Sequence, residues 1–302
     1  MKLFDFSQKI NYKNEILAGL TVAMTMIPES LSFAILAGFP PLVGLYAAFI
    51  MGLVTAVLGG RPGLVSGGAG ATVITLIALM KSHGIEYVFA AVALAGVVQI
   101  LVGIFKLGKF IRLVPQPVMY GFVNGLAVVI FMSQLEQFKT IVNGQSEWLS
   151  GTPLYIMGGL VALTIAIVYI FPKITKAVPA SLVAIIAIFA ISIIFGIETK
   201  TVEDIASVQG GFPPFHLPQI PLSWDAFQII LPYAVIMAAV GLTEGLLTLN
   251  LVDEITGTRG NSNRECIAQG TANIANGFFG GMGGCPMICL LYTSDAADEG
   301  LG

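Results

Sequence analysis

The sequence predicts an all-α polytopic membrane protein, from its composition, its long uncharged stretches and two glycine-rich segments inside them. Of its 302 residues, 56% are hydrophobic and only 10% are charged, and the mean hydropathy is +0.89. Soluble domains carry roughly 25% charged residues, so this chain has too few to cover a surface that faces water. The composition therefore excludes an ordinary soluble enzyme, a disordered protein and a nucleic-acid binder with a basic face.

Uncharged stretches predict nine membrane-spanning helices and the start of a tenth. A membrane helix needs about 20 mostly apolar residues, and the first long stretch fits two helices that are broken at Gly38-Phe39-Pro40-Pro41. Strands in lipid would need alternating polarity and a closed barrel, and these stretches do not alternate. The predicted spans are 14–37, 42–59, 67–80, 86–105, 115–133, 153–171, 178–196, 228–250 and 265–280, with the tenth starting near Gly283.

The basic residues predict a cytoplasmic N-terminus. With that orientation, eleven Lys and Arg residues fall inside and only Lys81, Lys139 and Lys200 fall outside. An excess of Lys and Arg on the cytoplasmic side is typical of membrane proteins. This distribution of charge requires the third segment, 67–80, to cross the membrane. Because 67–80 is too short to span as a helix alone, residues 61–66 would form an extended half of the same crossing, shielded from lipid by protein. Residues 1–13 are polar and contain no signal peptide. We expect an integral protein of a prokaryotic plasma membrane.

Two glycine-rich segments, 59–72 and 278–287, resemble copies of one element at membrane depth. By our count they end the second and ninth spans, and an offset of seven spans gives the two copies opposite orientations. Paired broken helices in inverted repeats mark the binding site of secondary transporters. The alternative is that these glycines only aid helix packing, but packing glycines are usually spaced by four residues and not clustered.

The broken helices predict a site for a small anion. Half-helix starts expose backbone N–H groups and the positive end of the helix dipole, and glycine lets a ligand approach that backbone closely. Two opposed starts would hold an anion without a cationic side chain. The candidate substrate-binding residues are Gly68, Ala69, Gly70, Ala71, Thr72, Gly284, Cys285 and Pro286.

Two carboxylates inside spans are candidates for ion coupling. Glu29 lies in the first span, and Glu244 lies in the eighth with Thr248 one turn later. A carboxylate at membrane depth is costly and marks function by default; it could carry a proton, or bind Na⁺ together with the Thr248 hydroxyl. The alternative is a structural partner for a distant polar group. Gln99 and Asn124 are interpreted as interhelical hydrogen-bonding residues.

The chain resembles the sulfate permease (SulP) family of anion transporters over about residues 1–288. The motifs that carry the resemblance occur in the family's order: AGLTV at 18–22, IPESLSFA at 27–34, PLVGLY at 41–46, the glycine-rich 59–72, VPQPV at 114–118, GFVNG at 121–125, GFPPF at 211–215 and 270–287.

The resemblance implies fourteen spans in two inverted repeats of seven, an elevator-like cycle and a homodimer when the protein is full length, often with a cytoplasmic STAS domain. Core helices would occupy 1–110 and 228–288, where the second repeat is truncated, and gate helices 111–227. Sodium-coupled members carry an Asp and a Thr at the positions of Glu244 and Thr248. The longer Glu here, and an acid at Glu29 where the family often has a neutral residue, favour protons over sodium.

The resemblance stops after Ile288. The segment 289–302 reads like a translated sequencing adapter, so we predict a non-native tail and a natural protein that continues.

We therefore predict a proton-coupled symporter of small inorganic anions, with sulfate or bicarbonate as substrate and no cofactor or nucleic-acid partner. The alternatives are a sodium-coupled bicarbonate symporter, an anion exchanger or channel of the same family, and a nucleobase permease of similar architecture. An enzyme is not expected, because the chain has neither a metal-ligand motif nor a nucleophile–base pair.

Overall fold

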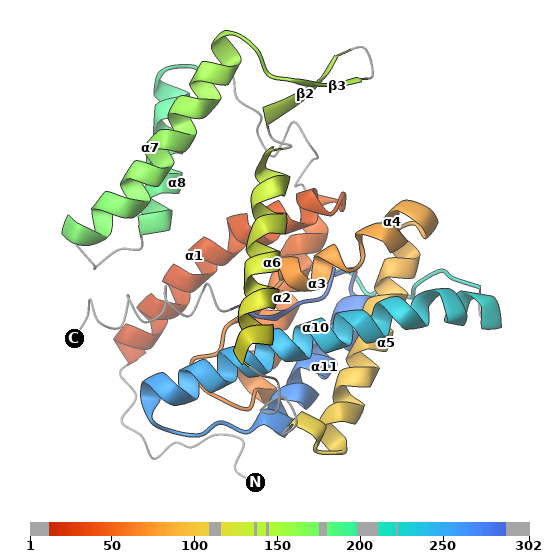
Figure 1. Ribbon diagram of the computed structural model, residues 1–302. Coiled ribbons are helices and arrows are strands. Elements are labelled where there is room, and N and C mark those ends of the chain that lie inside the picture. Colours follow the sequence, from red (N-terminus) through yellow and green to blue (C-terminus); the bar gives the residue numbers. More distant parts are fainter. Residues whose placement is uncertain are drawn as a thin grey trace. The chain divides into compact units, whose positions relative to one another are not determined.

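The computed structural model describes residues 12–108, 116–135, 138–142, 145–174, 180–197, 211–221 and 223–287 (Figure 1). Most of these residues are helical, which confirms the predicted fold class. The elements are α1 (Tyr12–Leu36), α2 (Pro41–Leu58), β1 (Ser66–Gly67), α3 (Gly70–Ile74), α4 (Ile77–His83), α5 (Ile85–Ile104), α6 (Gln116–Leu135), β2 (Lys139–Val142), β3 (Gln145–Trp148), α7 (Thr152–Ile174), α8 (Ala180–Ile194), α10 (Trp224–Thr256), α11 (Ser262–Phe278) and β4 (Cys285–Pro286).

Five of the described helices are long and apolar enough to cross a membrane. They are Ala18–Leu36, Pro41–Leu58, Ile85–Ile104, Thr152–Ile174 and Trp224–Glu254. The predicted span 228–250 is longer in the structure, because α10 begins at an N-cap where the Ser223 hydroxyl accepts from the N–H of Ala226. The predicted tail at 289–302 lies outside the described residues.

The described residues form two compact units. One contains Met26–Pro115 and Val208–Tyr292, and the other contains Asn11–Thr25 and Gln116–Ser207. In the second unit, α7 and α8 pack against each other. The predicted substrate and coupling residues all belong to the first unit, so the fold of that unit positions the site.

Helix α11 is the centre of the first unit and packs against α5 and α2 (Figure 1). Glycines let α5 and α11 approach until their backbones nearly touch: a Cβ on Gly96 would lie 2.5 Å from the carbonyl oxygen of Gly270, and one on Gly277 would lie 2.6 Å from that of Phe89. Since later residues of α5 meet earlier residues of α11, the two helices run antiparallel. Small residues at such crossings are typical of membrane helix pairs.

The predicted helix at 67–80 is interrupted in the structure. Gly67 belongs to the extended strand β1, the helix begins at Gly70, and it breaks after Ile74 before α4 starts. At the break, the Thr75 hydroxyl donates to the carbonyl of Thr72, and the N–H of Leu76 donates to Val73, three residues back. These tighter bonds replace the regular α-helical pattern.

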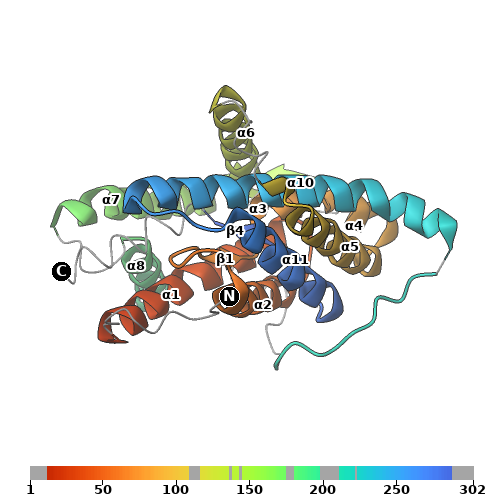
Figure 2. The same cartoon turned by 90° about the horizontal axis from the view of Figure 1, so that it is seen from below.

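The structure contains short strands that the sequence analysis did not predict, although it expected an extended segment at 61–66. β1 and β4 form a buried antiparallel pair, and β2 pairs antiparallel with β3. Figure 2 shows β1 and β4 side by side, and β4 contacts α10 while β1 contacts α2. Such a ladder is compatible with membrane depth because protein surrounds it.

The segment 211–221 is tied to the start of α5 through His216, to which the sequence analysis assigned no role. The His216 ring nitrogen lies 2.8 Å from a carboxylate oxygen of Glu86, and that oxygen also accepts the backbone N–H of Gln219. The N–H of His216 donates to the carbonyl of Phe278 at the end of α11. These bonds hold the connection into α10 against α5 and α11.

The helix crossing gives a stability prediction. Replacing Gly96 with Leu should destabilise the first unit by about 1–3 kcal/mol or more, since the new side chain meets backbone that cannot rotate away. Thermal unfolding in detergent measures the effect. Gly158→Leu on α7 is the control, because a Cβ there has open space. Equal melting temperatures for the two variants would contradict the close crossing.

Candidate functional site

The two glycine-rich segments meet at the centre of the first unit. In the β1–β4 pair, Ser66 lies opposite Pro286 and Gly67 opposite Cys285. The N–H of Met287 donates to the carbonyl of Val65 and extends the pairing. A side chain on Gly284 would overlap the carbonyl oxygen of Gly67, so only glycine permits this approach. The antiparallel direction is the one that two copies of opposite orientation require.

The predicted substrate-binding residues lie together in these two segments. Gly68, Ala69, Gly70, Ala71 and Thr72 are all buried, as are Gly284, Cys285 and Pro286. Ala69 precedes α3 with extended backbone and offers no side-chain cap. The N–H groups in the first turn of a helix lack intrahelical partners, so the segment presents backbone donors to any ligand that reaches it.

Two of the predicted coupling residues, Glu244 and Thr248, lie on α10, and the third, Glu29, lies on α1. A carboxylate oxygen of Glu244 accepts a hydrogen bond from the Cys285 thiol at 3.0 Å. The Thr248 hydroxyl, which is buried, donates to the Glu244 carbonyl at 2.8 Å and keeps its lone pairs. Glu29 is near enough to Glu244 for an electrostatic interaction between the two carboxylates. The structure therefore brings Glu244 to the second glycine-rich segment, with Thr248 one turn further along α10 and Glu29 on α1.

Glycines on α10 allow this close approach. A Cβ on Gly241 would lie 3.3 Å from the Thr72 methyl group and 3.7 Å from the Cys285 Cβ, and one on Gly245 would lie 2.8 Å from the Pro286 ring. Helix α10 thus packs directly against both glycine-rich segments with the face that carries Glu244. The first segment has a further neighbour in α1, whose Phe33 ring covers Gly70.

A buried polar stripe on α11 holds both segments, and the sequence analysis missed it. Glu265 accepts the N–H of Gly60, and Gln269 donates to both Glu265 and Ser66. One turn later, Asn273 accepts the N–H of Gly284 and donates to its carbonyl. The spacing of Glu265, Gln269 and Asn273 by four residues was the available signal, because it places three polar side chains on one helix face.

Gln99 has a defined orientation with an unused donor. The N–H of Gly284 fixes the Asn273 oxygen as an acceptor, so the Asn273 NH₂ group donates to the Gln99 oxygen at 2.9 Å. The NH₂ group of Gln99 is then buried without a hydrogen-bond partner among the described residues. It faces Gly241, where a Cβ would be 3.1 Å away. The interhelical bond expected of Gln99 is present, and a free donor remains beside the site.

Arg61 anchors the approach to β1. Its side chain pairs with Asp253 and donates to the hydroxyls of Thr256 and Thr258 at the end of α10. The N–H of Asn261 donates to the carbonyl of Gly60. Breaking a buried ion pair of this kind typically costs about 3–5 kcal/mol, so the turn before β1 is held firmly. The described residues contain no cluster of His, Cys, Asp and Glu that could hold a metal ion.

Asn273 provides a second prediction. Replacing it with Leu leaves the buried N–H of Gly284 and the Gln99 oxygen without partners, at about 1–3 kcal/mol for each group. We expect a clear loss of thermal stability, measured by unfolding in detergent. Thr271→Val on the same helix is the control, because that hydroxyl bonds only within the helix. An Asn273→Leu protein as stable as this control would show that the bonds to Gly284 are dispensable.

The chain is similar to known anion transporters over nearly its whole length. The model of the sulfate permease family matches residues 12–286. A Bacillus subtilis protein named "Putative sulfate transporter YbaR" is 41% identical over 92% of this chain and 56% of its own length. The bicarbonate transporter BicA of Picosynechococcus is 31% identical over 92% of this chain and 53% of its own length. The chain thus spans about half the length of these curated relatives.

Solved structures show the same fold. The transmembrane domain of a cyanobacterial bicarbonate transporter BicA superposes with a TM-score of 0.80 at 28% identity, over 96% of this chain and 78% of that one. The murine Solute Carrier 26 family member A9 anion transporter, in its inward-facing state, gives a TM-score of 0.77 at 19% identity, over 96% of this chain and 54% of that one. On this evidence the chain belongs to the sulfate permease family, whose members are integral membrane transporters and not enzymes.

Proposed function

We propose that the full-length protein carries small inorganic anions, sulfate or bicarbonate, by proton-coupled symport across a prokaryotic plasma membrane. The anion binds between the segments from Gly68 to Thr72 and from Gly284 to Pro286, and the backbone N–H groups at the start of α3 are its donors. In the second segment the N–H of Gly284 is already taken by Asn273, and Pro286 has none. Support comes from the meeting of the two segments and from the names of the relatives. The sequence has no Lys or Arg between Arg61 and Lys81 or between Trp224 and Arg259, so we take neutral groups, the backbone N–H groups and Gln99 among them, as the donors.

The hydrogen bond between Glu244 and Cys285 carries the argument for coupling. It places a carboxylate oxygen 3.0 Å from a residue of the proposed anion site. At about 4 Å, two like unit charges repel by about 4 kcal/mol even at an effective dielectric constant of 20. An anion therefore binds far better when a cation has neutralised Glu244, and this preference links the two binding events.

A proton is the cation that the arrangement favours. Glu29 and Glu244 interact electrostatically, and two neighbouring carboxylates at membrane depth repel less when they share a proton. Sodium is the alternative, because a Glu244 oxygen and the Thr248 hydroxyl oxygen are hard ligands of the kind that sodium prefers. Exchange or channel activity would need no coupling cation.

Further proposals concern the cycle and the assembly. The two compact units suit an elevator-like cycle, in which the unit that carries the site moves as a body. We place the N-terminus in the cytoplasm on the distribution of Lys and Arg, and we expect a homodimer. The predicted core (1–110 and 228–288) and gate (111–227) boundaries remain part of this proposal.

The coupling ion can be tested in vesicles that contain the full-length protein. Glu244→Gln should remove the acceleration of sulfate or bicarbonate uptake by an inward proton gradient and preserve exchange, because the amide mimics the neutral acid. Radiolabelled uptake at several pH values measures both. Glu254→Gln is the control, since that side chain lies exposed on the same helix. Unchanged proton stimulation in Glu244→Gln would exclude this residue as the proton carrier.

Thr248 distinguishes sodium from protons. Under proton coupling, Thr248→Ala should change uptake little, whereas under sodium coupling it should abolish sodium-dependent uptake. Thr243→Ala is the matched control, because its hydroxyl makes the same bond to a carbonyl four residues back, on a side chain that is less buried than Thr248. Uptake that needs sodium at every pH and fails in Thr248→Ala would replace the proton with sodium in this proposal.

The binding site has its own test. Gln99→Met removes the free donor and the bond to Asn273 without adding a charge. If the donor assists anion binding, this variant should raise the KM for sulfate by about tenfold, the equivalent of about 1.4 kcal/mol. If the KM is unchanged, Gln99 serves Asn273 alone.

A further inference from the structure

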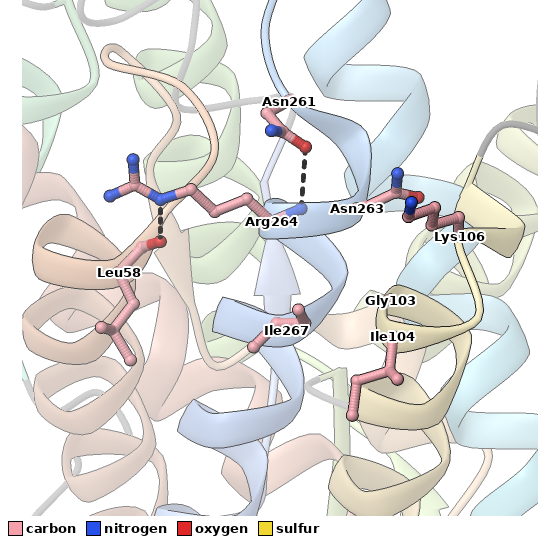
Figure 3. A pocket seen from close by; sticks show the side chains of 8 residues that line it. All are labelled: Leu58, Gly103, Ile104, Lys106, Asn261, Asn263, Arg264 and Ile267. Carbon is pink, nitrogen blue, oxygen red and sulfur yellow. Dashed lines mark hydrogen bonds between the residues drawn. The ribbon is translucent and has the colours of Figure 1, made fainter. Parts of the chain in front are cut away.

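An open cavity of about 440 Å³ lies where α2 and α5 end and α11 begins (Figure 3). Its volume falls within the range of roughly 300–1,000 Å³ that is typical of small-molecule sites. The cavity shares no lining residue with the proposed anion site around β1 and β4. Its lining includes Leu58, Ile104, Lys106, Asn263, Arg264 and Ile267.

The polar wall of the cavity carries two cations and no acid. Arg264 reaches from α11 to the end of α2, where its Nε donates to the carbonyl of Leu58 at 2.8 Å (Figure 3). Within the described residues, its terminal amino groups and the Lys106 amine make no hydrogen bond. The adjacent Glu265 is directed away from the cavity, to Gly60 and Gln269. The planar guanidinium group, with its fixed donors, suits a phosphate.

Lys106 has a left-handed backbone conformation, which is unfavourable for a residue with a side chain. Its φ of 56° is the one positive value at a residue other than glycine in the described chain. The residue follows the end of α5, and its N–H donates to the carbonyl of Gly103. Glycine is the usual residue at such a helix end. A residue with a side chain is uncommon in this conformation, and this lysine brings positive charge to the end of a helix and to the cavity.

The opposite wall is apolar and continues onto the outside of the helices. Ile104 is 58% exposed and Ile267 is 36% exposed, and Leu101, one turn before Ile104, is 45% exposed. The apolar span of α5 ends at Ile104, so the cavity lies at the level where hydrocarbon gives way to headgroups. A free sulfate or phosphate would use the cations and leave this wall unoccupied, whereas a phospholipid uses both.

We propose that this cavity binds an anionic phospholipid, with the headgroup attracted by Lys106 and Arg264, which Figure 3 shows on opposite sides of the start of α11, and an acyl chain along Ile104 and Ile267. Basic pockets between membrane helices recognise headgroups in this way. In the orientation proposed above, the lipid belongs to the cytoplasmic leaflet. The site does not depend on the transport mechanism, and its occupancy would hold the ends of α2 and α5 to the start of α11.

Native mass spectrometry of the full-length protein tests the proposal. The protein is stripped of lipid in detergent and given equal amounts of phosphatidylglycerol and phosphatidylcholine. We expect it to retain phosphatidylglycerol preferentially, and Lys106→Gln and Arg264→Gln each to lower that retention roughly fivefold, the equivalent of about 1 kcal/mol per cation. Lys81→Gln, an exposed residue in the last turn of α4, is the control and should change nothing.

Lys106→Gln keeps the test valid if Arg264→Gln fails to fold, because the Lys106 side chain holds no part of the described structure. Equal retention of the two lipids by the unaltered protein would overturn the proposal, and so would a Lys106→Gln protein that retains phosphatidylglycerol as the unaltered protein does. Displacement of the lipid by excess inorganic phosphate, with phosphate bound in its place, would identify a free-anion site and also overturn it.

Discussion

The close antiparallel crossing of β1 and β4 is the constraint on which the rest of the first unit depends. Two broken helices at membrane depth leave backbone groups that lipid cannot satisfy. Here the backbone groups of β1 and β4 form hydrogen bonds with each other. This pairing is possible because Gly67 and Gly284 have no side chains where they meet. Some of the other groups are bound by α11, whose Asn273 binds both backbone groups of Gly284. Helix α11, which carries Asn273, in turn packs closely against α5, and Gly96 and Gly270 permit this approach.

The same arrangement explains how a site for anions can lack a basic side chain. Backbone N–H groups are weak donors one by one, but here they are fixed by the crossing and need no rearrangement when a ligand binds. In the proposed mechanism, the negative charge of Glu244 opposes anion binding until a cation neutralises it. Binding that depends on a mobile cation is the physical basis of symport.

Much of the fold could be predicted from hydropathy, because apolar length and glycine clusters are local signals. The predicted 42–59 and 86–105 agree with Pro41–Leu58 and Ile85–Ile104, and the pairing of the two glycine-rich segments follows from counting spans. The break after Ile74 could not be predicted, since it depends on the Thr75 hydroxyl taking the Thr72 carbonyl. The partners of Glu265 and Gln99 lie on distant elements, so their roles required the structure. The His216–Glu86 contact was hidden for the same reason.

The central claim is that anion binding around β1 and β4 requires neutralisation of Glu244 by a proton. Proton uptake on anion binding measures this most directly: sulfate or bicarbonate is added to the purified full-length protein in weakly buffered, sodium-free solution, and the pH change is recorded. The account predicts uptake of about one proton for each anion bound, and binding without proton uptake in Glu244→Gln. Anion binding to the unaltered protein that takes up no proton, or that occurs only when sodium is present, would contradict it.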